Sequence, residues 1–243
     1  MNTENKFYLY ENDLKDQNVL VLGASGYLGT EICKELKKRN ANLFTHTNNG
    51  NIPTGSTTNF KCDLSNNNEV NEFINYLVNS DVFFNSLIIA SANIEEDIAL
   101  IVDFYSIVNI INLLIKNKKI KDCILKIGLS IEDFNFEGNS EFLSANRAIH
   151  GYLASASGEF SSYEIKTIYL KLGFLEKGIS KKLNQKEVIR FMNKTGQEEL
   201  LSVYDIANDI VNSLSFPKVL NVKYTYENTM LVGQIGYKTE VDV

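Results

Sequence analysis

One glycine-rich segment constrains the fold of this chain more than any other feature of the sequence. Gly23, Gly26 and Gly29 fit the pattern G-x-x-G-x-x-G, directly after the apolar run 18–22 and before a segment with apolar residues at helical spacing. At such a junction the first glycine permits a tight turn, the second lets backbone amides approach a pyrophosphate, and the third lets the helix pack on the strand. Turns also use glycine for its backbone freedom alone. In this strand-turn-helix setting we predict dinucleotide binding through Gly23, Ser25, Gly26, Tyr27, Leu28 and Gly29.

Short apolar runs alternate with helical patterns along the rest of the chain. Strands are predicted at 18–25, 41–46, 59–64, 81–91, 123–130, 165–174 and 236–243, and helices at 26–40, 68–80, 95–117, 142–161, 186–194 and 202–214. This alternation implies a Rossmann-like, doubly wound α/β fold, in which a parallel sheet of about seven strands has helices on both faces. Because 243 residues suit one large domain better than two small ones, we expect a single domain over 1–243.

The charge and the few cysteines and histidines exclude several classes of function. Lys and Arg number 24 against 30 acidic residues, and the net charge of -6 argues against a nucleic-acid-binding surface. The three cysteines lie far apart and there are only two histidines, so neither a metal site nor a disulfide framework is predicted. The first residues lack the pattern of a signal peptide, and the most apolar stretches are too short or too interrupted to cross a bilayer. We therefore expect a soluble, cytoplasmic protein without a membrane partner.

The residues at the end of the second predicted strand bear on the choice of cofactor. An acidic residue there would bind the ribose of NAD, and an arginine would bind the 2'-phosphate of NADP. The chain has His46, Thr47 and Asn48 instead, so NADP(H) is favoured only slightly over NAD(H). That the protein binds no cofactor stays an open alternative. We expect Thr47 and Asn48 at the cofactor and interpret His46 as a polar loop residue. After the third strand, Asp63 and Leu64 either reach the adenine edge or, for Asp63, cap the next helix.

Several segments together resemble the short-chain dehydrogenase/reductase family over nearly the full length of the chain. They are VLVLGASGYLG, CDL, DVFFNSLI, ILKIGLS, IKTIYLKLGF, VYDIANDIVNSL and VGQIGYKTEVDV. The glycine spacing is more like that of the extended, sugar-nucleotide members, whereas the length and the carboxyl-terminal segment are more like those of the compact members. The resemblance implies cofactor contacts from Ser86, in the segment that is usually Asn-Asn-Ala-Gly, and from Gly173 after the sixth strand.

The resemblance also implies a catalytic serine, tyrosine and lysine, the last two in Tyr-x-x-x-Lys, with a helper asparagine. Ser130 matches the serine, and Asp103 stands near the position of the asparagine. An ungapped match counted back from the sixth strand puts Phe142 at the tyrosine and Asn146 at the lysine. A second register, in which Tyr152 is the acid, is less favoured but stays open. No tyrosine in the sequence is followed four residues later by lysine, so in either register the usual proton donor lacks its charged partner.

A polar stretch over 176–199 follows the sixth strand at the edge where open α/β sheets bind ligands, and it resembles the family's mobile substrate lid. Nearby charges, such as Lys171, Lys177 and Glu141, are interpreted as surface groups. The leading hypothesis is an atypical oxidoreductase that acts on a small carbonyl or alcohol substrate in a biosynthetic pathway. Two alternatives stay open: a catalytically degenerate relative that senses cofactor or supports a partner, and a non-redox dehydratase or cyclase on the same fold.

Two predicted helices offer apolar and small faces beyond those needed against the sheet. They carry Phe104, Tyr105, Ile107, Ile110 and Ile111 on the first helix, and Ala148, Tyr152, Ala156 and Phe160 on the second. Proteins that resemble this chain associate through these helices, so we predict a homodimer or homotetramer.

Overall fold

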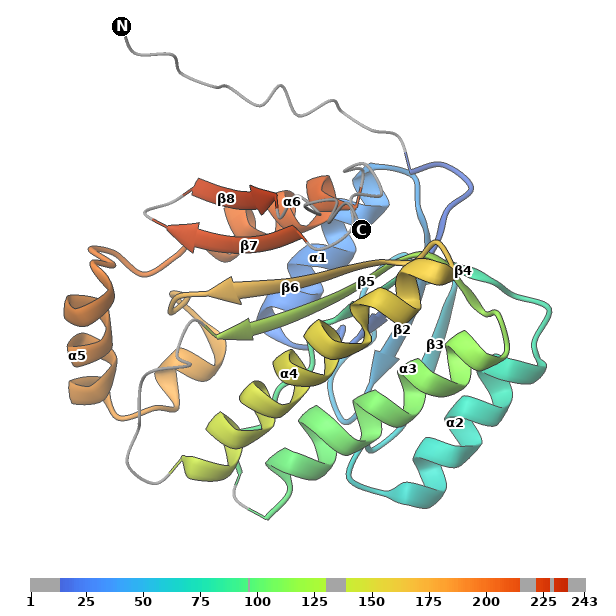
Figure 1. The fold of residues 1–243 in the computed structure, drawn as a ribbon, viewed down its shortest axis with the longest axis horizontal. Helices are drawn as coiled ribbons and strands as arrows, with labels where there is room; N and C mark the ends of the chain where they lie inside the picture. Colours follow the sequence, from blue (N-terminus) through green and yellow to red (C-terminus); the bar gives the residue numbers. More distant parts are fainter. Residues whose placement is uncertain (1–13, 96, 130–138, 215–221, 228–229, 236–243) are drawn as a thin grey trace, which may run out of the picture.

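A single twisted sheet runs through the molecule (Figure 1). The computed structural model describes residues 14–95, 97–129, 139–214, 222–227 and 230–235. The strands in these ranges are β1 (Asn18–Leu22), β2 (Asn42–Thr47), β3 (Thr58–Lys61), β4 (Phe84–Ile89), β5 (Ile120–Leu129), β6 (Lys166–Leu172), β7 (Val222–Glu227) and β8 (Met230–Ile235). Their order in the sheet is β3-β2-β1-β4-β5-β6-β7-β8. Strands β1 to β7 pair in parallel, and β8 runs antiparallel to β7.

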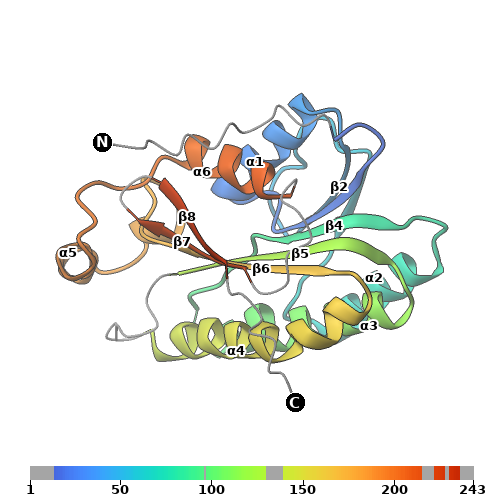
Figure 2. The ribbon, with the colours of Figure 1, turned by 45° about the horizontal axis from the view of Figure 1, so that its top comes forward.

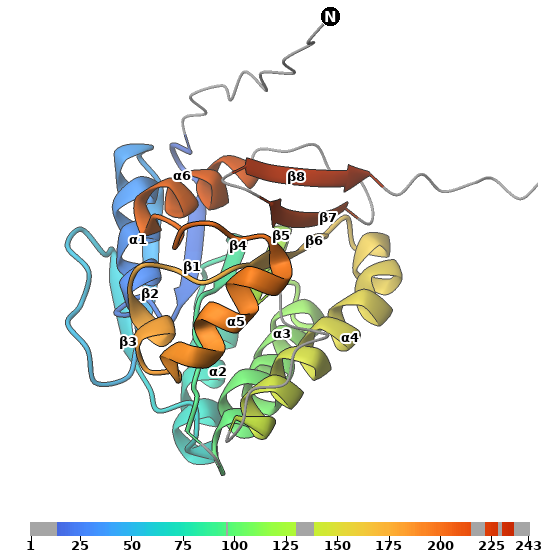
Figure 3. The ribbon, with the colours of Figure 1, turned by 90° about the vertical axis from the view of Figure 1, so that its left-hand side faces the viewer.

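Helices cover both faces of this sheet. They are α1 (Tyr27–Lys38), α2 (Asn67–Asn79), the π-helix η1 (Ile101–Tyr105), α3 (Ser106–Lys116), α4 (Ser140–Ser162), the 3-10 helix η2 (Gly178–Lys181), α5 (Gln185–Thr195) and α6 (Val203–Ser213). Figure 2 shows α1 and α6 on one face and α2, α3 and α4 on the other, which confirms the doubly wound α/β fold. Helix α5 lies beyond the carboxyl ends of β5 and β6 (Figure 1), and it stands in front of the sheet when the molecule is viewed from that side (Figure 3). None of the described helices combines the length and apolar character that a bilayer crossing requires.

Side-chain alternation along β1 explains why both faces of the sheet need a cover. Leu20 and Leu22 belong to the core beneath α2, α3 and α4. Val19 and Val21 belong to the opposite core, beneath α1 and α6. All four side chains are fully buried. Because successive residues of a strand face opposite sides, a strand buried on both faces is a continuous apolar run, as it is here before the glycines.

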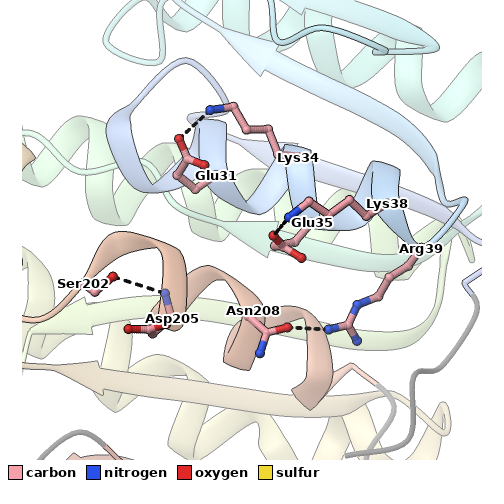
Figure 4. A network of polar contacts seen from close by, with 8 residues as sticks. All are labelled: Glu31, Lys34, Glu35, Lys38, Arg39, Ser202, Asp205 and Asn208. Carbon is pink, nitrogen blue, oxygen red and sulfur yellow. Dashed lines mark hydrogen bonds and ion pairs between the residues drawn. The ribbon is translucent and has the colours of Figure 1, made fainter.

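Helices α1 and α6 lie side by side and are joined by a polar contact between distant parts of the chain (Figure 4). The Nη2 group of Arg39 donates a hydrogen bond to Oδ1 of Asn208 at 2.8 Å. Along α1, Lys34 and Lys38 form ion pairs with Glu31 and Glu35, respectively. Such exposed pairs contribute little to stability, so the apolar contact beneath them holds α6 on α1.

The first six predicted strands are confirmed as β1 to β6. The seventh was predicted at 236–243, which lies outside the described residues, and the structure forms β7 and β8 earlier, at 222–227 and 230–235. The helix predicted over 95–117 is present, but its first part is the π-helix η1 rather than an α-helix. The expected sheet, its parallel pairing and its two helical layers therefore agree with the structure.

Several residues of the faces proposed for association pack inside the chain, and the predicted homodimer or homotetramer stays a prediction. Ile107, Ile110 and Ile111, on α3, are fully buried, and Phe160, on α4, is 2% exposed. They complete the core against the sheet, so these four side chains are not part of the exposed surface. Tyr105 is 62% exposed and stays available.

Candidate functional site

The turn between β1 and α1 has a backbone shape that excludes a side chain at two positions. Gly23 has a φ of 78°, and a Cβ atom there would lie 2.6 Å from the backbone nitrogen of Ser91. A Cβ atom on Gly29 would lie 2.2 Å from the carbonyl oxygen of Gly23, closer than real contacts allow. Helix α1 can therefore pack directly on the end of β1 only because both residues are glycines.

The amino-terminal end of α1 is suited to an anion. Gly26 precedes the helix and has no side chain to cap it, and the first turn contains no acidic residue. A Cβ atom on Gly26 would meet only the oxygen of Gly23, at 3.3 Å, so the backbone there can be approached closely. Unpaired backbone N–H groups and the helix dipole attract phosphate at such a position. The turn thus fits the pyrophosphate of a dinucleotide.

The other predicted residues of the turn differ in what they can contact. A Cβ atom on Gly50 would lie 2.4 Å from Cβ of Ser25, so the loop after β2 rests directly on Ser25. Tyr27 is 63% exposed, and its ring lies beside Gly178 at the start of η2. Leu28 packs against the core beneath α1. Ser25 and Tyr27 therefore present side chains around the turn, whereas the side chain of Leu28 faces inward.

His46 is a buried residue of β2, which corrects its interpretation as a polar loop residue. The ring is 2% exposed and packs against Phe73. Its Nδ1 accepts a hydrogen bond from the backbone N–H of Gly23 at 3.3 Å, and its Nε2 lies 2.9 Å from the carbonyl oxygen of Cys62. Burial lowers the pKa of His46, partly offset by the bond to Cys62, so the neutral ring is favoured. Of the two residues predicted at the cofactor, Thr47 is buried and Asn48 is exposed.

The carboxylate after β3 belongs to a local turn. Asp63 accepts hydrogen bonds from the backbone N–H and the hydroxyl of Ser65, at 2.9 and 2.7 Å. Asn66, not Asp63, caps α2, by accepting from the backbone N–H groups of the first turn. Leu64 is 3% exposed, and its carbonyl oxygen accepts a hydrogen bond from Ser106. Asp63 is partly exposed at the carboxyl edge, so its side chain is the one of the two that can face a ligand.

The structure corrects the position of Ser86. Ser86 lies inside β4, pairs with Val19 of β1 and is 2% exposed. Ala90 and Ser91 instead follow the strand at its carboxyl end, directly behind Gly23. The sequence match was displaced because the apolar residues 87–89 continue the strand beyond the polar Asn-Ser pair.

Two buried charged residues lie near the carboxyl end of β4, and one of them was not identified as a site residue from the sequence. Asp103, in η1, is 1% exposed, and its Oδ2 accepts a hydrogen bond from the backbone N–H of Asn93 at 2.8 Å. Lys126, in β5, is also 1% exposed, and its Nζ donates to the carbonyl oxygen of Ser91 at 2.9 Å. The sequence did contain a signal for Lys126, since it is a lone lysine within the apolar run of a central strand.

Burial shifts the pKa values of both groups toward their neutral forms. The pKa of Asp103 is raised to about 6, because desolvation outweighs the attraction of Lys126 and the bond from Asn93. Desolvation lowers the pKa of Lys126, and Asp103 opposes that shift. Each charge therefore supports the other in an interior that disfavours both.

The positions matched to the catalytic tyrosine and lysine lie at the start of α4 and are buried. Phe142 is 2% exposed and Asn146 is 7% exposed. Asn146 donates from Nδ2 to the carbonyl oxygen of Phe142 at 3.0 Å, and its own carbonyl oxygen accepts from the hydroxyl of Tyr169 at 3.2 Å. Ser130, the matched serine, lies outside the described residues. The structure thus brings Asp103, Phe142 and Asn146 to one face of the sheet, but the positions matched to the catalytic tyrosine and lysine carry neither residue type.

Tyr152, the acid of the second register, lies elsewhere on α4. Its hydroxyl donates to Oδ1 of Asn112 on α3 at 2.5 Å, and its ring meets that of Phe160. Burial raises the pKa of Tyr152, with a smaller contribution from Glu159. Ten residues of helix correspond to about 15 Å of rise, so Tyr152 lies far along the helix from Phe142. The two registers therefore place the acid at different points along α4, and the Phe142 register stays a prediction.

The predicted lid segment 176–199 is closed onto the start of α4 by an apolar cluster, which we call the lid cluster. Its buried members are Ala99, Phe142, Leu143, Phe174, Leu183, Val188 and Phe191. Gln197 fastens the far end of the segment to the chain after β6: its Oε1 accepts from the backbone N–H of Phe174, and its Nε2 donates to the carbonyl oxygen of the same residue. A Cβ atom on Gly173 would lie 2.4 Å from Oε1 of Gln197, so this glycine makes room for the fastening.

Glu141 is not the surface charge that the sequence suggested. Its carboxylate accepts hydrogen bonds from the backbone N–H groups of Asp97 and Leu100, at 2.5 and 3.1 Å. Acidic side chains at a helix start satisfy its unpaired N–H groups and complement its dipole. Glu141 therefore holds the helix that carries Asp103 against the start of α4.

The described residues do not assemble a metal site. No group of three or more His, Cys, Asp or Glu side chains in the described ranges could hold an ion. Cys33, Cys62 and Cys123 are separately buried free thiols, and burial raises their pKa values to about 12, about 12 and about 11.

Comparison with known proteins agrees with this geometry. Residues 19–115 match the model of the NAD dependent epimerase/dehydratase family. A short-chain dehydrogenase/reductase from Serratia marcescens has a TM-score of 0.72 at 15% identity, covering 85% of this chain and 93% of its own. A short chain dehydrogenase family protein from Francisella tularensis has a TM-score of 0.69 at 16% identity, covering 82% and 91%. One from Mycobacterium ulcerans has a TM-score of 0.71 at 11% identity, covering 84% of each chain. No curated protein sequence matches the chain.

These findings confirm the predicted resemblance: part of the chain matches the epimerase/dehydratase family model, and the fold is like that of solved short-chain dehydrogenases/reductases. The family match covers the part of the chain that contains the glycine turn. The solved structures share the whole fold with the chain at low identity, so they support the fold alone.

Proposed function

We propose that this chain binds a nicotinamide dinucleotide at the turn Gly23–Gly29 and acts as an atypical oxidoreductase on a small carbonyl or alcohol. The observation that carries this proposal is the turn itself. The absent side chain of Gly29 lets the amino-terminal end of α1 sit on the oxygen of Gly23, and Gly26 leaves the backbone open to a phosphate. A turn of this shape at the first strand of a parallel sheet is the phosphate site of dinucleotide-binding folds.

The residues around the turn then have distinct roles. The backbone N–H groups at the start of α1 would hold the pyrophosphate, while Asn48 and Asp63 would face the adenosine half from the ends of β2 and β3. Asn48 carries no charge, so it neither repels a 2'-phosphate as an acid would nor pairs with it as an arginine would. This keeps NADP(H) slightly favoured. When bound, the nicotinamide would supply hydride exchange.

Carbonyl chemistry in this site has to proceed without the usual tyrosine. Phe142 has no hydroxyl that could donate a proton, and Asn146 has a neutral amide at the position of the lysine ammonium. We assign Ser130 to the substrate oxygen, with water delivering the proton, and the segment 176–199 to the lid that excludes bulk solvent. The rate is expected to be low, because a missing general acid costs about 10²–10⁴-fold.

A second candidate function is a catalytically degenerate relative that binds dinucleotide as a sensor. The burial of Phe142 in the lid cluster favours it, because the side chain at the tyrosine position packs against the lid instead of facing a substrate. In such a protein, cofactor binding would be read out through the lid rather than through turnover.

Titration with NADPH and NADH tests the proposal, with nicotinamide fluorescence and the thermal midpoint as readouts. A ligand at 100 times its Kd adds about 2.7 kcal/mol of stability, which a melting curve resolves. Saturable binding of either dinucleotide is the expected result, and binding of neither contradicts both candidates. A screen of small carbonyl compounds then separates them, because turnover that is lost in Ser130→Ala supports the enzyme, whereas binding without turnover supports the sensor.

A further inference from the structure

The buried charges Asp103 and Lys126 are the strongest feature that the proposed function leaves without a role. Both side chains are 1% exposed, on different elements that meet beside the carboxyl end of β4. Removing two charges from water is unfavourable, and a well-packed apolar pair in their place is often no less stable. Such a pair is therefore weak evidence for stability and stronger evidence for a specific task.

Both charges bind the same short piece of backbone. Lys126 donates to the carbonyl oxygen of Ser91, and Asp103 accepts from the N–H of Asn93, at 2.9 and 2.8 Å. One charge reaches the segment Ser91–Asn93 from the sheet and the other reaches it from η1. The segment is thus fixed at two points by charge-assisted hydrogen bonds, which are stronger than neutral ones.

The segment held in this way forms the back wall of the glycine turn. A Cβ atom on Gly23 would lie 2.6 Å from the nitrogen and 2.7 Å from the Cα of Ser91, so no side chain separates the two backbones. Just before it, Ala90 donates to the carbonyl oxygen of Leu22 at 2.9 Å. A shift of Ser91 would therefore be passed directly to the turn that we propose as the pyrophosphate site.

The surroundings of Asp103 also indicate a task other than stability. It lies in a π-helix, a rare and strained form that is frequent at functional sites, and Glu141 fixes the start of the same helix. Its Oδ1 and the hydroxyl of Ser91 are buried and have no hydrogen-bond partner among the described residues. A carboxylate retained only for stability would have both oxygens bonded, because buried polar groups rarely stay unpaired.

We propose that Asp103 and Lys126 are positioning residues for the dinucleotide, which act by holding Ser91–Asn93 at the distance that the turn at Gly23 requires. This inference rests on the proposed dinucleotide binding. It adds that the segment after β4, held by these two side chains, keeps the glycine turn in place. It predicts that losing either charge weakens dinucleotide binding even when the chain stays folded.

The test compares Lys126→Met with Lys166→Met as a matched control. Lys166 is also buried, at 5% exposure, and donates to the carbonyl oxygens of Ser213 and Leu214. It lies at the amino end of β6, away from the carboxyl ends of the strands where the glycine turn lies. Binding of NADPH and NADH is measured by fluorescence at a temperature where circular dichroism shows each variant to be folded. We expect the Kd of Lys126→Met to rise about tenfold, as is typical of residues that act on a site through others, and that of Lys166→Met to stay within about twofold.

A second variant keeps the inference falsifiable if Lys126→Met does not fold. Asp103→Asn preserves the shape and an oxygen acceptor for Asn93 while removing the charge, and we expect the same rise in Kd. In the unmodified chain, saturating dinucleotide should also slow hydrogen exchange at the amide of Asn93. Unchanged affinity in these variants, or equal weakening in Lys166→Met, overturns this inference alone. Absence of binding by the unmodified chain overturns the proposed function and the inference together.

Discussion

The imidazole of His46 is hydrogen-bonded to the backbone of Gly23, the first glycine of the turn. The N–H of Gly23 donates to Nδ1 at 3.3 Å, so the Nε2 that lies 2.9 Å from the oxygen of Cys62 carries the proton. A neutral ring in this one tautomer therefore ties the turn to the ends of β2 and β3. The conformation of the proposed phosphate site thus depends on a side chain from the neighbouring strand.

This relationship predicts how stability depends on pH. Because the pKa of His46 in the fold lies below its ordinary value of 6.5, its contribution is complete above about pH 6.5 and is lost as the pH falls through the lower folded value. Protonation would place a hydrogen on Nδ1, facing the N–H of Gly23. Asp103 changes stability with pH in the opposite direction. Because its pKa in the fold is raised to about 6, its ionised form destabilises the fold above that pH, and protonation on acidification removes this cost.

The difference between the natural chain and His46→Gln isolates the histidine. We expect the unfolding free energy of the natural chain to fall more steeply between pH 7 and pH 5 than that of the variant, in urea titrations at each pH. The chain has only two histidines, so His150→Gln assigns their proton resonances and shows directly which ring titrates. Parallel stability curves for the natural chain and His46→Gln would contradict this role.

Gly29→Ala should disrupt the turn between β1 and α1. The new Cβ atom would lie 2.2 Å from the backbone oxygen of Gly23, which cannot rotate away as a side chain could. We expect a loss of about 1–3 kcal/mol in unfolding free energy and loss of dinucleotide binding. Gly158→Ala is the control, because a Cβ atom there meets nothing within 4 Å in the interior of α4. That variant should gain about 0.5–1 kcal/mol and bind normally, whereas normal binding by Gly29→Ala would refute the assigned site.

The sequence predicted the features that depend on local patterns. Six strands and the glycine turn follow from apolar runs and from a motif within seven residues, both of which are visible along the chain. The roles of His46 and Lys126 were missed because a single polar residue in a strand does not reveal which buried groups face it. Their partners are backbone atoms of Gly23, Cys62 and Ser91, and only the assembled sheet brings them together.

The fastening of the lid by Gln197 predicts a second measurable effect. Gln197→Ala removes both hydrogen bonds to the backbone of Phe174, each contributing about 0.5–1.5 kcal/mol. Trypsin cleavage within 176–199 should therefore become about 5–150-fold faster under native conditions. Gln185→Ala is the matched control, because Gln185 donates to Ser180 and Leu183 inside the segment and does not join it to β6. Equal cleavage of the two variants would exclude Gln197 as the fastening.

Restoring the family's pair in Phe142→Tyr with Asn146→Lys is expected to cost stability without raising reductase activity above that of the natural chain. Phe142 is 2% exposed and the other buried members of the lid cluster are apolar, so a tyrosine hydroxyl there would lose its water without gaining a partner, at about 1–3 kcal/mol. The measurements are urea unfolding and NADPH oxidation with simple ketones. Phe160→Tyr makes the same chemical change at an equally buried site of α4 and should cost similar stability, without bearing on activity. Ketone reduction by the double variant but not by the natural chain would contradict this prediction. It would mean that the lid opens enough for α4 to present the pair to a substrate, and that the chain is an oxidoreductase that has lost these two residues.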